Sequence, residues 1–237
     1  MSITTEIHMT HDYDPRMLDA LHEAAHAVVF NMMGIGATDL VALDPEDRPD
    51  LCGVHRYHHS RPRLFEEQHQ LLELHVMDYL HSAAGWLAEC RLTPDLYEEN
   101  GEPFWDAFLD SGVYGEELPD GVAAVKSLNA AAQILGLPQR GKKYYTKTMD
   151  QEIKALAMSV MDPACWRVIE TMAEDLHRKG QLTGDDVRRY QIPEWDAESN
   201  PARQLASRWV RRFHRWYPNP KITFLGWPEC GWISNAS

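Results

Sequence analysis

Apolar residues recur every three to four positions over residues 15–33, which is the period of an amphipathic helix. The residues that share this apolar face are Met17, Leu21, Ala25, Val28 and Met32. Asp14 and Pro15 supply an N-cap followed by a proline at the first helical position, and Gly34 stands where a glycine commonly ends a helix. The pattern therefore predicts a first helix over 15–33.

The remaining pattern predicts two short strands followed by further helices. Two apolar runs, 39–44 and 51–57, flank a turn rich in proline and aspartate, which indicates a small sheet. Helical periodicity returns at 64–92, 120–135, 147–161 and 163–179, a short helical turn fits 183–187, and 93–119 is irregular. The expected fold class is mainly α with a small β-sheet (α+β).

The composition changes after residue 194. Five of the eight tryptophans lie in 195–237, and this segment carries a net charge of +3 while the remainder carries −16, which gives the total of −13. We therefore predict a domain over 1–194 and a Trp/Arg-rich appendage over 195–237. Its stretch 208–217 fits a helix folded back on the body or a surface for a protein partner. Nucleic acid fits least, because an acidic chain repels phosphates.

Cysteine usage and terminal composition indicate the compartment. The four cysteines are widely spaced, as is typical of reduced thiols rather than of a disulfide framework. The polar, acidic N-terminus does not resemble a signal peptide, and the longest apolar stretch, 24–37, is too short to cross a bilayer. We expect a soluble, cytoplasmic protein without a membrane partner. Its oligomeric state is left open.

The first predicted helix contains the motif HExxH, formed by His22, Glu23 and His26. Four residues separate the two histidines, so both imidazoles lie on one helix face and can share a metal ion. Glu23 lies one position further round, where it can take a proton from a water whose pKa zinc lowers toward about 7. Val29 and Met32 occupy the positions of the metzincin glycine and third histidine, which excludes that class.

A catalytic zinc ion usually has three protein ligands, so a further residue is needed. The acidic candidates are Glu46, Glu89, Asp106, Asp110 and Asp120. Glu46 lies in a predicted turn and fits a gluzincin site weakly. Asp120 opens a predicted helix, where a carboxylate in the first turn is easily ordered; the less favoured alternative is that it serves only as an N-cap.

The segment HEAAHAVV, residues 22–29, resembles the HEAGHAxx signature in the peptidase domain of FtsH-type ATP-dependent zinc proteases. Four later segments also resemble parts of that family, and they follow in the order in which the family has them. They are 41–45 with 53–54, AGWLAE at 84–89, Asp120 with Ala124, and 168–187. The resemblance covers about 15–190 and implies a zincin-type, FtsH-like fold. Because HExxH begins at residue 22, we expect a peptidase domain that stands alone, without the ATPase module.

The resemblance implies a zinc metalloendopeptidase in which His22, His26 and Asp120 bind Zn²⁺ and Glu23 is the general base. It implies a structural role for Glu89. Without an unfoldase, such an enzyme would cleave an extended segment of a chosen protein, so we expect a regulatory protease. The alternative is a zinc-stabilised binding module, or an inactive relative, that holds a partner without cleaving it.

The stretch around 53–57 corresponds in that resemblance to the edge strand beside the active site. Gly53, Val54, His55 and Tyr57 are therefore the candidate substrate-binding residues, because an edge strand can bind an extended peptide by adding it to the sheet. His55, Tyr57 or His58 could also donate a hydrogen bond to the oxyanion. A second metal site, formed by His55 with His58 or His59, is a less favoured alternative.

Overall fold

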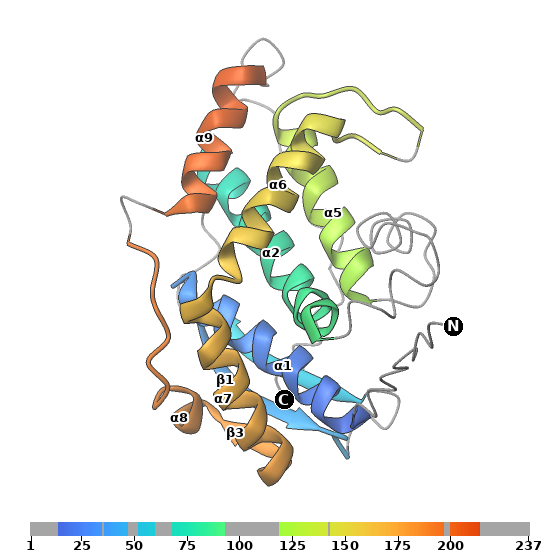
Figure 1. Ribbon diagram of the computed structural model, residues 1–237. Helices are drawn as coiled ribbons and strands as arrows, with labels where there is room; N and C mark the ends of the chain where they lie inside the picture. Colours follow the sequence, from blue (N-terminus) through green and yellow to red (C-terminus); the bar gives the residue numbers. More distant parts are fainter. Residues whose placement is uncertain are drawn as a thin grey trace, which may run out of the picture.

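The computed structural model describes residues 14–34, 36–46, 52–59, 68–92, 119–141, 143–196 and 200–213. They form a mainly helical fold with one small antiparallel sheet, which confirms the predicted α+β class (Figure 1). The elements are α1 (Pro15–Met32), β1 (Gly36–Leu43), β2 (Gly53–His59), α2 (Gln68–Leu92), α5 (Pro119–Ile134), α6 (Lys147–Val160), α7 (Pro163–Lys179), β3 (Gln181–Thr183), α8 (Gly184–Val187) and α9 (Pro201–Phe213).

Helix α1 begins and ends where the sequence predicts. The Asp14 carboxylate accepts a hydrogen bond from the backbone N–H of Arg16 at 3.0 Å, and Pro15 occupies the first helical position. Gly34 follows the helix with φ of 64°, a left-handed conformation that glycine adopts without steric cost. The helix contacts β1, α2 and α7, and residues 24–30 are all buried. The HExxH motif therefore lies on an enclosed helix near the middle of the fold (Figure 1).

The sheet has the strand order β2-β1-β3, and both pairings are antiparallel. Strand β1 pairs Leu43 with Gly53 and Val41 with His55 on one side, and Val41 with Leu182 on the other. Strand β3 was not predicted. It comprises three residues directly after α7, too few to show an alternating pattern. In the described sheet β2 is an edge strand, as the sequence predicts.

One face of β2 packs toward α1. Side chains alternate along a strand, so Gly53, His55 and Tyr57 share a face. The ring of Phe30 in α1 lies 5.6 Å from that of His55 and 4.2 Å from that of Tyr57, centroid to centroid. Predicted substrate-binding residues are thus placed over the helix that carries HExxH.

Helices α2 and α5 pack against each other, and α2 also packs along α1. The observed bounds of α5, α6 and α7 lie within one residue of the predicted ones. Asp120 occupies the first turn of α5. The predicted irregular stretch was 93–119, and its last residue, Pro119, begins α5. Residues 93–118, with the ligand candidates Asp106 and Asp110, lie outside the described residues.

Helix α9 belongs to the common hydrophobic core. It packs on α2 and α6, and its buried residues are Ala202, Leu205, Ala206 and Trp209. The Trp209 side chain is fully buried, and its indole N–H donates to the Glu152 carboxylate at 2.8 Å. The described part of the predicted appendage is therefore integrated into the body. Of the alternatives weighed for 208–217, this packing matches the helix folded back, up to Phe213.

Trp209→Ala is expected to lower the free energy of unfolding by about 3–5 kcal/mol, because it leaves a large cavity in the core. Urea unfolding of the full chain measures this difference. Ser207→Ala is the matched control, since Ser207 is exposed on the same helix. Equal stability of the two variants would show that α9 docks without contributing to the core.

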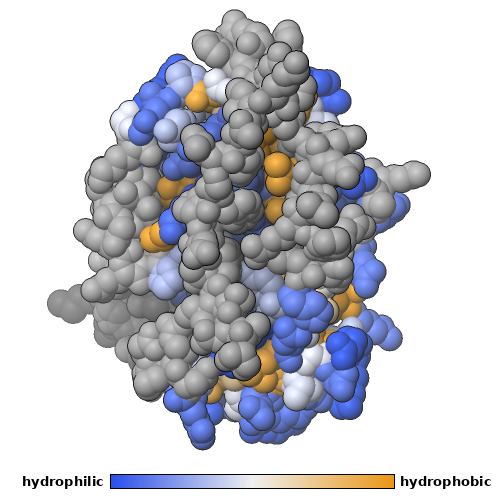
Figure 2. Space-filling view, turned by 180° about the vertical axis from the view of Figure 1, so that it is seen from behind, coloured by the Kyte–Doolittle hydropathy of each residue, from blue (hydrophilic) through white to orange (hydrophobic). Residues whose placement is uncertain are grey.

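No helix among the described residues is both long and apolar enough to cross a membrane. On the face that Figure 2 shows, the described surface consists mainly of hydrophilic residues with smaller hydrophobic patches between them.

Candidate metal centre

The two histidines of HExxH meet the Asp120 carboxylate at one point. The Nε2 atoms of His22 and His26 lie 2.9 Å apart, and Asp120 Oδ2 lies 3.0 Å from the first and 3.2 Å from the second. One helical turn of α1 places the imidazoles side by side, and the first turn of α5 brings the carboxylate from 94 residues further along the chain. Three potential ligand atoms therefore converge.

The other nitrogen of each imidazole is held from α2. His26 Nδ1 donates to the backbone carbonyl of His81 at 2.7 Å, because a carbonyl oxygen can only accept. His22 Nδ1 lies 2.6 Å from the Glu89 carboxylate. Such partners fix the tautomer and the ring orientation of metal-binding histidines. In both rings Nε2 is thereby the atom that faces Asp120.

This arrangement fits a metal cation. Three electron-pair donors that face one another at 2.9–3.2 Å need a proton or a metal ion among them. Tetrahedral zinc with ligand distances of about 2.0–2.1 Å separates its ligands by about 3.3 Å, close to the observed values. Two imidazoles and a carboxylate also match the donor types that zinc takes in catalytic sites, which keep a fourth position open.

The electrostatics of the cluster also favour a positive charge at its centre. Burial alone would lower the pKa of His22, but hydrogen bonds with Asp120 and Glu89 raise it well above its usual value. Burial opposes ionisation of Asp120 as well, yet the charge of His26 and the hydrogen bonds with both histidines hold the pKa of Asp120 far below its usual range. The carboxylate is thus ionised and oriented toward the two imidazoles.

Glu23 lies beside the cluster without joining it. Its side chain is buried, with 8% of the residue exposed. It runs directly beneath Gly53, where a Cβ atom would lie 2.5 Å from Glu23 Cγ and 2.7 Å from Oε1. Burial raises the pKa of Glu23, although the neighbouring His22 and His26 act in the opposite direction. A carboxyl group with a raised pKa next to a metal site is suited to accept and return a proton.

The other residues of β2 that were predicted to bind substrate, Val54, His55 and Tyr57, have surroundings that differ from those of Gly53. His55 Nε2 lies 2.9 Å from the Thr38 hydroxyl, and His55 Nδ1 lies 3.1 Å from His81 Nε2. Both ring nitrogens of His55 therefore have partners inside the protein, which leaves this side chain no free donor for the predicted oxyanion contact. Tyr57 packs on Phe30, and Val54 lies on the other face of the strand.

Among the described residues, the other predicted zinc ligands, and the less favoured second metal site around His55, do not share this geometry. Glu46 is exposed in the turn after β1, and Glu89 contacts Nδ1 of His22 rather than Nε2. His58 pairs with Asp39 at 2.7 Å. Within the described part of the chain, His22, His26 and Asp120 are the one group of three such side chains whose ligand atoms converge, all within 4.8 Å.

Comparisons with known proteins add no relative. No protein-family model matches the sequence, and a search of curated proteins finds no match. The case for a function therefore depends on the chemistry of the site.

Two features of α2 that support the site were missed in the sequence. His81, Gly85 and Glu89 are spaced by four residues, so they form one stripe that faces α1. The carbonyl of His81 orients His26, a contact that no side-chain pattern reveals. Gly85 could have been recognised from the sequence. Glycine in the middle of a long helix is unfavourable, so its presence there indicates that another group packs closely against it.

A methyl group at Gly85 would overlap the imidazole ring of His22. Gly85→Ala is therefore expected to displace this ligand and to weaken zinc binding by about 10–100-fold, the range found for residues that orient metal ligands. Competition with a chromogenic zinc chelator measures the affinity.

The same substitution provides its own structural control. Alanine favours a helix over glycine by about 1 kcal/mol, so helix content measured by circular dichroism should not fall. Unchanged zinc affinity in Gly85→Ala would contradict the close packing of α2 on His22.

Proposed function

We propose that the chain is a zinc-dependent endopeptidase with an FtsH-like peptidase fold. One observation carries the proposal: HExxH on α1 is joined by a distant carboxylate, Asp120, while its glutamate lies buried beside the cluster. The order of the elements also supports the resemblance. The motif helix is followed by two strands, by a long helix that carries Glu89, and by a helix that Asp120 opens.

In this proposal His22, His26 and Asp120 hold the zinc ion. Zinc, when bound there, polarises the carbonyl of the scissile peptide and lowers the pKa of a water molecule. Glu89 and the His81 carbonyl keep the two imidazoles in the orientation that binding needs.

Glu23 carries the proton in the proposed reaction. Its carboxylate takes a proton from the attacking water as the water oxygen bonds to the peptide carbon. The protonated Glu23 then gives this proton to the leaving nitrogen as the C–N bond breaks, so the base is regenerated. Burial raises the pKa of Glu23, which makes its carboxylate a stronger base toward the attacking water.

The edge strand β2 supports an extended protein segment as substrate. Its outer edge has no neighbour in the described sheet, so a peptide could pair with it through backbone hydrogen bonds. Gly53 lies against Glu23 at one end of this strand. A peptide bound there would pass close to the general base.

Removal of zinc tests the proposal. The protein as purified should contain one zinc ion per chain and should cleave an unfolded, fluorescently labelled protein. Treatment with 1,10-phenanthroline should abolish cleavage, and added zinc should restore it while added magnesium should not, because magnesium prefers oxygen ligands. Stoichiometric zinc without cleavage of any unfolded protein would favour the binding-module alternative.

A further inference from the structure

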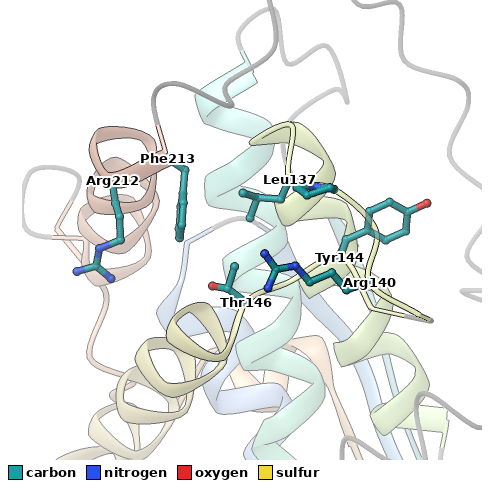
Figure 3. A pocket seen from close by; sticks show the side chains of 7 residues that line it. Leu137, Arg140, Tyr144, Thr146, Arg212 and Phe213 are labelled. Atoms are coloured by element: carbon teal, nitrogen blue, oxygen red, sulfur yellow. The ribbon is translucent and has the colours of Figure 1, made fainter.

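A cavity lies at the other end of α5 from the candidate metal centre. It has a volume of about 280 Å³ and lies between the end of α9 and the loop from α5 to α6. Its lining residues are Leu137, Pro138, Arg140, Tyr144, Thr146, Arg212 and Phe213. In Figure 3 the Arg140 guanidinium lies in the space that Leu137, Thr146 and the Phe213 ring border.

The loop that borders this cavity is basic, although the chain as a whole is acidic. Residues 138–147 contain four basic residues and no acidic one, in a chain of net charge −13. Within the described residues the Arg140 guanidinium makes no hydrogen bond or ion pair with a side chain. Arg212 is engaged already, since its Nη1 donates to the Glu152 carboxylate at 2.7 Å. Of the two arginines that line the cavity, Arg140 is therefore the one without a side-chain partner among the described residues, and Leu137 and Phe213 lie beside it.

We propose that this cavity binds an acidic peptide segment of a protein partner. A carboxylate of the peptide pairs with the Arg140 guanidinium, which can present two parallel N–H donors to it. An apolar side chain next to that carboxylate packs on Phe213 and Leu137. The recognised motif is thus an Asp or Glu adjacent to an apolar residue.

The size of the cavity favours side chains over a whole cofactor or a nucleic acid. The cavity's volume of about 280 Å³ lies at the lower limit of the about 300–1,000 Å³ of pockets that enclose a small-molecule ligand, a size that suits one or two side chains better than a whole cofactor. A polyanion would also extend over the acidic remainder of the surface, where it would be repelled.

This binding site does not depend on the peptidase function. Residues 120 and 134 are separated by about 21 Å along α5, at about 1.5 Å per residue. An extended peptide covers that distance in about six to seven residues. If the chain is a peptidase, one substrate could therefore occupy the cavity and the metal centre together.

Fluorescence anisotropy with the full-length protein tests the proposal. The probe is a short labelled peptide with the repeated sequence Glu-Phe-Asp-Leu, and its counterpart has Gln and Asn in place of the acidic residues. The acidic peptide should bind at least about tenfold more tightly than its amide counterpart, since charge-assisted hydrogen bonds are the stronger kind. Its affinity should fall as salt is added.

Substitutions then locate the site. Arg140→Gln should weaken binding of the acidic peptide by about tenfold or more, whereas Arg208→Gln, which removes the same charge from an exposed position outside the cavity, should change it little. Equal losses in the two variants, equal affinity for the two peptides, or no binding up to about 1 mM would overturn the proposal. Tighter binding of a single-stranded oligonucleotide, abolished by Arg140→Gln, would replace it with a nucleic-acid site.

Discussion

Glu23→Gln protein is expected to retain zinc at the level of the wild type while its rate of peptide hydrolysis falls by about 10²–10⁴-fold or more. Glutamine has nearly the same shape as glutamate, so it fits beneath Gly53, where the side chain has little room. The ligands His22, His26 and Asp120 are unchanged. Only the ability to accept a proton is lost. Metal analysis and initial rates on the same preparation measure the two effects.

A matched control and a substrate trap complete this experiment. Glu174→Gln makes the same chemical change on the exposed surface of α7 and should hydrolyse substrate at the wild-type rate. The Glu23→Gln protein should also retain in a pull-down a substrate that the wild type cleaves and releases. Wild-type turnover in Glu23→Gln would show that the proposed mechanism is wrong. A partner that both proteins hold equally, and that neither cleaves, would identify a binding module.

Local features of the fold could be predicted from the sequence because their causes are local. The Asp14 cap and Gly34 set the ends of α1, and the Asp162 cap and Gly180 do the same for α7. The two histidines of HExxH converge because they are four residues apart on a helix. None of these predictions required knowledge of which elements pack together.

Features that depend on packing were missed. Strand β3 is recognisable through its pairing with β1, and its three residues carry no periodicity. The tryptophans and the positive net charge of 195–237 suggested an appendage, but Trp209 of α9 is buried in the core, and α9 packs on α2 and α6. The contact from the His81 carbonyl to His26 involves the backbone, which residue identity does not reveal.

Support for Asp120 as the third ligand comes from both the sequence and the packing of the helices. No spacing rule connects Asp120 with His26, which precedes it by 94 residues. Its position at the start of a helix was predicted, but that position alone fits an N-cap as well as a ligand. The packing of α5 against α2, and of α2 against α1, brings its carboxylate to both Nε2 atoms.

Asp120→Ala is therefore expected to weaken zinc binding by more than about 100-fold and to abolish hydrolysis. Removal of this carboxylate leaves two imidazoles, fewer than the three protein ligands that catalytic zinc sites have. Asp120→Asn should give a smaller loss of affinity, because the amide oxygen can still coordinate while the negative charge is gone. Isothermal titration with zinc and activity at saturating zinc measure both effects.

Asp162→Ala separates ligation from a purely structural role. Asp162 caps α7 by accepting hydrogen bonds from the backbone N–H groups of Ala164 and Cys165. Its loss should cost about 1 kcal/mol of stability, as for other caps, without any change in zinc affinity. If Asp120 only caps α5, Asp120→Ala should behave in the same way, with a similar loss of stability and full zinc content. That outcome would indicate Asp106 or Asp110 as the third ligand. Loss of zinc in Asp120→Ala, but not in Asp162→Ala, would instead assign the third ligand to Asp120.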